Sequence, residues 1–371
     1  MASTLRLLPV EGSATRRAFI ELPKRLYRDD PHWVTPLNRD LQALLQHGKH
    51  PFHSEGRIDA LLALRGDAVV GRIAAIHNPA HQRHCGEDAA FFGFFECEQD
   101  REVAQFLLQA VTERSQGHAL LRGPYSPTTN YECGVLVAGE PGRPMLMMPH
   151  NPAWYGALLE NCGLRKAMDL IAFRYRLPEV NLERWERIAA LVQRRENVTL
   201  RPFEPQHFER ELKLVQQLYH DAWSANWGFV PMSAAELHHM AAELRPILRA
   251  DLGAFVLREG REVGFHFGLP DYNEVLQRLN GKLWPFGIVR ILLSKRRLRH
   301  MRLMLMGISR EFQQRGLDVL LYADVTRRAR AAGMKTCEAS WVLETNTTMR
   351  NTLLRSGSEE YRTYRLYEKP L

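Results

Sequence analysis

The sequence predicts a mixed α/β fold of the α+β type, in which two similar domains follow one another and each has a central mixed sheet flanked by helices. Its 371 residues suffice for two domains of ordinary size. Short motifs of the first half return in order in the second, as when Thr4-Leu5-Arg6 recurs at Thr199-Leu200-Arg201, about 195 positions later. The predicted domains span residues 1–180 and 197–371, and a charged helix over 178–197 is expected to connect them.

The second half predicts an alternating series of strands and helices. Apolar residues recur every three or four positions over 208–223, which indicates a helix, and Ser233 opens a capping box for the next one. Gly333 and Gly357 are suited to end two later helices. The expected order is strand 199–203, helix 208–223, helix from 233, strands 254–257 and 262–268, strand 301–308, helix 317–332, strand 336–343, helix 347–355 and strand 361–367.

The first half fits the same order, with 91–97 as its central strand and 101–116 as the helix that follows. Between them the chain reads Glu96-Cys97-Glu98-Gln99-Asp100, an acidic stretch that would repel a phosphate. The polar loop over 123–134 follows the next predicted strand. It is suited to hydrogen-bonding a substrate head group, and an ordinary surface loop is the alternative. The first domain is therefore expected to be a degenerate copy that shapes the acceptor site.

Nothing in the composition indicates a membrane-spanning or secreted chain. The apolar runs are shorter than the roughly 18 residues of a transmembrane helix, and residues 1–17 lack the apolar core of a signal peptide. The five cysteines are scattered and form no Cys-x-x-Cys pair, which is typical of a reduced chain. We therefore expect a cytoplasmic protein.

The excess positive charge lies in one segment. The net charge is +8, and no acidic residue occurs between Glu274 and Glu311. A basic amphipathic insertion over 275–300 is typical of an interfacial helix on an anionic membrane, and a basic lid helix packed on the protein is the alternative. Nucleic acid is not favoured, because aromatic residues do not alternate with the charges. The residues expected to contact membrane or acceptor are Trp284, Phe286, Lys295, Arg296 and Arg297.

A loop between a predicted strand and a predicted helix carries the most informative motif. Its glycine, Gly316, lets several backbone N–H groups point into one concavity at the start of a helix, and such a concavity binds a pyrophosphate. Arg310 and Arg315 add positive charge. The residues expected to bind the ligand that carries this pyrophosphate are Ile308, Gln313, Gln314, Arg315, Gly316, Leu317 and Asp318.

This loop resembles the pyrophosphate loop of the GNAT superfamily of acyltransferases. Gln313 and Gly316 match that motif in place, whereas Arg310 replaces a proline and Asp318 replaces a small residue. The resemblance implies that acyl-CoA is the co-substrate, that the thioester lies beside the backbone of 306–308, and that Asn346 lies near the pantetheine. It implies no metal.

The usual general acid of the superfamily is missing. A tyrosine often lies seven residues beyond the asparagine, and Leu353 stands there instead. The candidate bases are Glu338 and Glu344, which share strand parity with Ser340, and His266 on the neighbouring hairpin. Each of them could also be a solvated or core polar residue.

Two histidine clusters have a spacing that could suit metal ligands. One begins at His77 and includes His81, His84 and Cys85, and the other has histidines at every third position from His47. Both lie in predicted loops without a second cysteine pair, so a metal is not expected.

The whole chain resembles a bacterial tandem-GNAT family that includes bacterial ceramide synthases. The resemblance rests on Asp30–Val34, on Val70–Ala75, on Ser340–Glu344 and on the tail Tyr364–Lys369. It implies fatty-acyl transfer from acyl-CoA to the amine of a sphingoid base. With the basic insertion, we expect an enzyme bound peripherally to the inner membrane. The alternatives are an N-acetyltransferase for a small soluble amine and a catalytically silent binding protein. The sequence predicts no particular oligomeric state.

Overall fold

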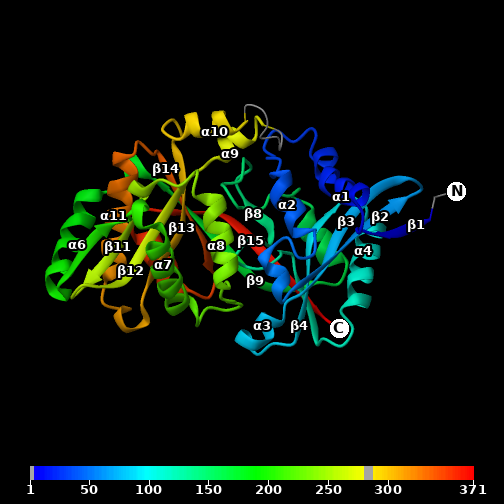
Figure 1. Ribbon diagram of the computed structural model, residues 1–371, viewed down its shortest axis with the longest axis horizontal. Coiled ribbons are helices and arrows are strands. Elements are labelled where there is room, and N and C mark those ends of the chain that lie inside the picture. The colour runs from blue at the N-terminus through cyan, green and yellow to red at the C-terminus, as the bar shows by residue number, and fades with distance from the viewer. Residues whose placement is uncertain (1–3, 280–286) are drawn as a thin grey trace.

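The computed structural model describes residues 4–279 and 287–371, and within them one continuous mixed sheet runs through the molecule (Figure 1). Thirteen strands belong to this sheet, in the order β1-β2-β3-β4-β5-β15-β9-β14-β13-β12-β11-β10, with β8 paired to β15. Helices cover the sheet along its length, and the two halves of the chain occupy opposite ends of the molecule.

The first half contains the expected series of elements, with α3 added between β3 and β4 and three short strands added before its last helix. Its elements are β1 (Leu5–Pro9), α1 (Ser13–Leu26), α2 (Asn38–Leu44), β2 (Arg57–Arg65), β3 (Ala68–His77), α3 (Pro79–Cys85), β4 (Ala89–Cys97), α4 (Arg101–Arg114), β5 (Leu120–Gly123), β6 (Tyr125–Ser126), β7 (Glu132–Cys133), β8 (Val135–Gly139), α5 (Tyr155–Asn161) and β9 (Arg165–Arg176).

After the linker helix the second half also follows the expected order, with α9 and α10 added between β12 and β13. Its elements are α6 (Leu182–Glu196), β10 (Val198–Pro202), α7 (Phe208–Trp223), α8 (Ala234–Leu244), β11 (Gly253–Arg258), β12 (Arg261–Pro270), α9 (Asn273–Leu276), α10 (Gly287–Ser294), β13 (His300–Ile308), α11 (Leu317–Ala331), β14 (Thr336–Leu343), α12 (Thr347–Arg355) and β15 (Glu359–Pro370). The capping box predicted at Ser233 is present, because Ser233 Oγ accepts from the N–H of Glu236 and the Glu236 carboxylate accepts from the N–H of Ser233.

The two halves exchange their last strands. β15, the last strand of the second half, pairs with β5 of the first, while β9, the last strand of the first half, pairs with β14 of the second. β15 and β9 then pair with each other in the middle of the sheet. Their side chains follow the exchange, since Leu366 packs in a core with Phe19 and Leu62, whereas Phe173 packs with Met301 and Tyr322.

In the second half, the two faces of the sheet are covered by different helices. α7 places Phe208, Val215 and Leu218 against β11 and β12, in a core that includes Phe255 and Phe265. On the other face, α11 packs against α6, and the two helices share a second core with the sheet. The expected linker helix is thus a structural part of the second half.

The insertion over 275–300 contains α9 and α10, whereas Trp284 and Phe286 lie outside the described residues. In α10, Ile291 packs inward, but Val289, Leu292 and Leu293 are 51%, 51% and 72% exposed. No helix among the described residues is long and apolar enough to cross a membrane.

Candidate active site

A gap opens between the central strands of the second half. β13 and β14 run parallel, but they pair only from His300–Thr336 to Leu303–Ala339. Beyond that point β13 continues beside β12, while β14 continues beside β9 after a register shift between Ala339 and Val342. The two strands therefore diverge from Met304 and Ser340 onward, and a ligand can enter between them.

The predicted pyrophosphate loop lies at the end of β13. Gly316 has a φ of +82° and is the N-cap of α11, and Gln314 also has a positive φ. Among the described residues, no acceptor is bonded to the N–H groups of Gln314, Arg315 and Gly316. Backbone donors left open at a helix start form an anion site. Leu317 is buried in the core beneath the loop, so its side chain supports the loop from below.

The polar side chains of the loop have protein partners. Gln313 Nε2 donates to the carbonyl of Ile308 at 3.0 Å, and the Arg315 guanidinium lies 3.5 Å from Glu196 of α6. Arg195 of α6 donates to the carbonyl of Arg315. Asp318 stands in the first turn of α11. The linker helix thus shapes the loop, which the sequence did not indicate.

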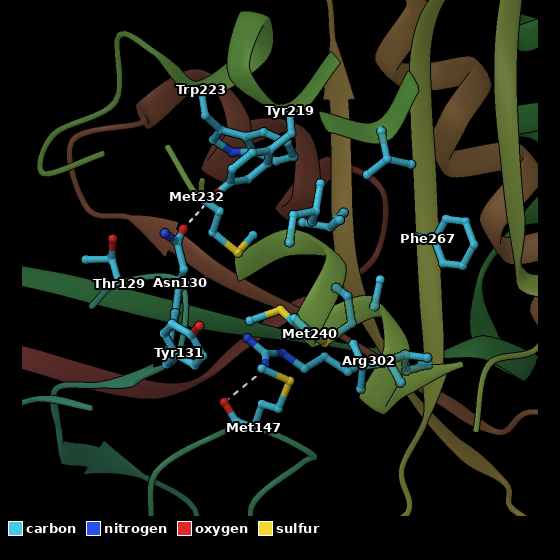
Figure 2. A pocket seen from close by; sticks show the side chains of 18 of the residues that line it. Thr129, Asn130, Tyr131, Met147, Tyr219, Trp223, Met232, Met240, Phe267 and Arg302 are labelled. Carbon is cyan, nitrogen blue, oxygen red and sulfur yellow. Dashed lines mark hydrogen bonds between the residues drawn. The ribbon is translucent and has the colours of Figure 1, made fainter. Parts of the chain in front are cut away.

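A pocket of about 280 Å³ lies on the α7 and α8 face of the sheet, beside the gap (Figure 2). Its walls are mainly apolar and aromatic. They come from α7, α8 and the loop between them, and from β12, β13 and β14. Met304 and Ser340, where the two strands diverge, both line it. The pocket therefore adjoins the gap from the face opposite α11.

The first half supplies part of the pocket wall. Thr129, Asn130, Tyr131 and Cys133, all from the polar loop over 123–134, line the pocket, and Figure 2 shows the first three on one side of it. Asn130 is fixed there, because its Oδ1 accepts from Tyr219 Oη at 2.5 Å and its Nδ2 donates to the carbonyl of Val230 at 2.9 Å.

Glu338 lies behind the pocket and is fully buried. Its Oε1 accepts from Ser340 Oγ at 2.6 Å, its Oε2 accepts from Tyr361 Oη, and Arg302 Nε lies 3.8 Å away. Arg302 Nε also donates to Ser340 Oγ at 2.9 Å. Burial raises the pKa of Glu338, which Arg302 and the Ser340 hydrogen bond oppose.

Glu344 and Glu338 are not brought together. The register shift after Ala339 ends the common parity that the sequence suggested, and Glu344 lies beyond the end of β14. Its carboxylate accepts from Lys166 Nζ at 2.6 Å and from the N–H of Asp169 at 3.0 Å, both on β9. Glu344 is not among the residues that line the pocket.

His266 points to the other face of the sheet. It is fully buried, and its Nε2 lies 2.8 Å from Asp324 of α11. Burial lowers the pKa of His266, and Asp324 opposes that shift. The neighbours Phe265 and Phe267 face α7 instead. Sheet alternation thus directs His266 away from the pocket.

Two further positions that the GNAT resemblance singles out lie at α12. Asn346 is the N-cap of this helix, and its Oδ1 accepts from the N–H of Met349 at 3.1 Å. Leu353, which stands where the superfamily often has its tyrosine general acid, is fully buried in the core between α11 and the sheet.

The first half has a carboxylate near the end of its corresponding strand, β4. β4 and β5 pair only from Ala89–Leu120 to Phe91–Arg122, so they also diverge. Glu96 stands in that part of β4, and its Oε2 accepts from Tyr27 Oη and Tyr155 Oη, each at 2.7 Å. A half-buried, hydrogen-bonded carboxylate thus stands on β4 beyond its pairing with β5.

Metal ligands do not cluster in the described residues. Across 4–279 and 287–371, no three His, Cys, Asp or Glu side chains are arranged to hold a metal ion. His81 lies 2.9 Å from Glu87, and His50 stacks edge-on with His239.

The architecture matches solved tandem GNAT proteins. One from the clavulanic acid biosynthesis pathway superposes with a TM-score of 0.58 at 12% identity, covering 99% of this chain and 98% of that one. A GCN5-related N-acetyltransferase from Sphaerobacter thermophilus gives 0.54 at 14% identity, covering 99% and 95%. The fold is therefore the tandem GNAT fold.

Sequence comparison identifies the family. No protein-family model matches the chain. Protein YghO of Escherichia coli (strain K12) is 34% identical over 368 residues, 96% of this chain and 93% of the relative. The Bacterial ceramide synthase of Caulobacter vibrioides is 34% identical over 380 aligned residues, 99% of this chain and 98% of the relative. The chain belongs to the tandem GNAT N-acyltransferase family that includes bacterial ceramide synthase.

Proposed function

We propose that this protein transfers a fatty acyl group from acyl-CoA to the amine of a long-chain, sphingoid-type base. The observation that carries the proposal is the apolar pocket, which adjoins the gap between β13 and β14. One ligand can enter that gap from the α11 face and another from the pocket face, so two substrates can meet between the strands.

The loop before α11 would hold the pyrophosphate of acyl-CoA. The free N–H groups of Gln314, Arg315 and Gly316 form the anion site, and the dipole of α11 favours negative charge there. From this loop the pantetheine would run into the gap between β13 and β14, and the thioester would reach the residues where the strands diverge. Asn346 stands at the start of α12, on that path.

The chemistry of the pocket favours a lipid-like acceptor. Apolar and methionine side chains such as Met232 and Met240 dominate its walls, and they bind alkyl chains through apolar burial. A small hydrophilic amine would leave these apolar walls exposed to water. The name of the Caulobacter relative, Bacterial ceramide synthase, also supports a long-chain base as the acceptor.

A lipid acceptor must reach the pocket from a membrane, and α10 provides a surface for that contact. Its exposed Val289, Leu292 and Leu293 adjoin the cationic run Lys295–Arg297. Ile291 of α10 packs in one apolar cluster with Leu244 and Met304, which also line the pocket. We therefore propose that the enzyme binds peripherally to anionic membranes, with α10 at the lipid surface near the pocket.

The direct test is mass spectrometry of the products formed from palmitoyl-CoA or acetyl-CoA and a panel of amines. The panel contains a long-chain sphingoid base, a simple long-chain alkylamine and small soluble amines. We expect an amide of the long-chain base and release of free coenzyme A.

Acylation of only the small amines would replace the proposal with a soluble acetyltransferase-like function. Coenzyme A binding without any product would favour the binding-protein alternative.

A further inference from the structure

The fully buried carboxylate of Glu338 cannot touch a substrate in the pocket. It has no exposed surface and does not line the pocket. Tyr361 of β15 covers its Oε2, and Arg302 lies beside its Oε1. The residue that connects this carboxylate to the pocket is Ser340, which lines the pocket and whose Oγ donates to Glu338 Oε1 at 2.6 Å.

We propose that Ser340 is a catalytic residue that passes the proton of the attacking amine to Glu338 and later returns it to the leaving sulfur. The inference rests on the proposed function, and it assigns a residue that no pattern in the sequence had marked as catalytic.

The position of Ser340 favours this role. It is the first residue of β14 beyond the last pair with β13, so it stands where the thioester would lie. Its oxygen accepts from Arg302 Nε at 2.9 Å, which leaves one lone pair free to accept an N–H from an amine in the pocket. An N–H bonded there is one hydroxyl away from the buried carboxylate.

Ser340 and Glu338 together can carry the proton through the whole reaction. As the amine nitrogen forms its bond to the thioester carbon, its proton moves to Ser340 Oγ, and the Ser340 proton moves to Glu338. When the carbon–sulfur bond breaks, Glu338 returns the proton through Ser340 to the thiolate. The products are the amide and free coenzyme A, and both protein groups recover their starting state.

This relay also accounts for the missing general acid. Leu353, buried in the core, cannot protonate a thiolate. The buried acid of Glu338, once it has gained a proton, can do so, because Arg302 and the Tyr361 hydroxyl beside it stabilise the carboxylate that forms when the proton leaves.

The groups around Glu338 keep the relay in place. Arg302 is held by the carbonyls of Leu146 and Met147 at 2.9 and 3.0 Å, so it positions Ser340 and Glu338 together. Arg362 and Tyr364, both on β15, also face this cluster and interact electrostatically with Glu338. Arg302 and Tyr361 are therefore positioning residues.

The test measures kcat, KM and acyl-CoA affinity for Ser340→Ala, Ser340→Thr and Glu338→Gln. We expect Ser340→Ala and Glu338→Gln each to lower kcat by about 10²–10⁴-fold with unchanged acyl-CoA affinity. Ser340→Thr keeps the hydroxyl and should restore most of the rate. The double variant should be no slower than either single one, because both act on one proton path.

Glu359→Gln is the matched control, since Glu359 is an exposed carboxylate on β15 that pairs with Arg174. Circular dichroism checks that each variant is folded. If wild type forms the amide and Ser340→Ala stays within about threefold of its kcat, the relay is wrong. If wild type forms no amide, the proposed function itself fails.

Discussion

At the scale of single residues, Gly316 is the position where a side chain is least compatible with the proposed coenzyme site. Its φ of +82° is unfavourable for any residue with a Cβ, by about 1–2 kcal/mol. A β-branched side chain would also crowd the backbone N–H groups of the loop. We predict that Gly316→Val weakens coenzyme A binding at least about tenfold, measured by calorimetric titration.

Gly163→Val is the matched control for this substitution. Gly163 also has a positive φ, of +88°, and no atom lies within 4 Å of an added Cβ. It should retain wild-type affinity for coenzyme A. Gly123 would be an unsuitable control, because an added Cβ would lie 2.3 Å from the carbonyl oxygen of Phe92. Equal affinities of Gly316→Val and wild type would place the phosphates elsewhere.

Tyr361 controls the proton affinity of Glu338 without touching the substrate. Its hydroxyl donates to the charged carboxylate, so its loss should raise the pKa of Glu338 further. Because Glu338 accepts a proton only as a carboxylate, the rise of kcat with pH should move to higher pH in Tyr361→Phe. A charge-assisted hydrogen bond of about 1.5 kcal/mol corresponds to roughly one pH unit.

The measurement is the pH profile of kcat for Tyr361→Phe beside wild type. Tyr272→Phe serves as its control, since the buried Tyr272 hydroxyl donates to the carbonyl of Ile247 instead. A profile of Tyr361→Phe that coincides with wild type would mean that Glu338 does not set the proton step.

At the scale of elements, local signals predicted most boundaries of the second half to within one residue. α7, β14 and α12 begin and end at the predicted residues, because apolar spacing and flanking caps are local properties of the chain. The shared parity of Glu338 and Glu344 was wrong, since a register shift is decided by pairing with β9, about 170 residues away. The sequence alone also cannot decide whether the loop over 123–134 contacts a substrate or lies on the surface, because the residues that it bonds to, such as Tyr219 and Val230, lie in the second half.

α10 is the element on which membrane contact can be tested. Replacing Leu292 and Leu293 with Ser should remove apolar insertion, and replacing Lys295, Arg296 and Arg297 with Gln should remove about 1 kcal/mol of attraction each. Salt should weaken only the second contribution. Flotation on phosphatidylglycerol vesicles, at low and high salt, measures both.

Phosphatidylcholine vesicles are the control for charge, and coenzyme A affinity is the control for folding. We expect wild type to bind anionic vesicles and neither set of changes to alter coenzyme A affinity. A wild type that stays unbound to anionic vesicles at low salt would make α10 a lid of the protein.

At the scale of the whole molecule, the strand exchange should make both halves unfold together. Leu366 of β15 is fully buried in the core of the first half, although it belongs to the last strand of the second. Leu366→Ala should cost about 2–5 kcal/mol, a large part of a typical stability of roughly 5–15 kcal/mol.

Calorimetry should show one transition for wild type and for Leu366→Ala, with the variant shifted to lower temperature. Leu191→Ala, at a 66% exposed position on α6, should change stability by less than about 0.5 kcal/mol. Two separate transitions, of which only one moves in Leu366→Ala, would show that the halves unfold independently.

The sequence repeat predicted two domains but not this exchange. A repeat shows that two segments fold alike, whereas the choice of partner for β9 and β15 depends on neighbours that lie in the other half. Either choice satisfies the same hydrogen bonds and alternation of side chains, so no local pattern distinguishes them.

The exchanged strands give this chain the connectivity of a dimer. Two half-length chains that traded their last strands would build the same sheet, and α6 is the covalent link that turns such a pair into one molecule. In a dimer of identical chains, any substitution appears twice. Once the copies are joined, each can change alone, and here one carries the glycine loop while the other carries the hydrogen-bonded Glu96 near the end of β4. The link thus permits a molecule with a single asymmetric centre, in which one copy can be specialised as the scaffold for the other.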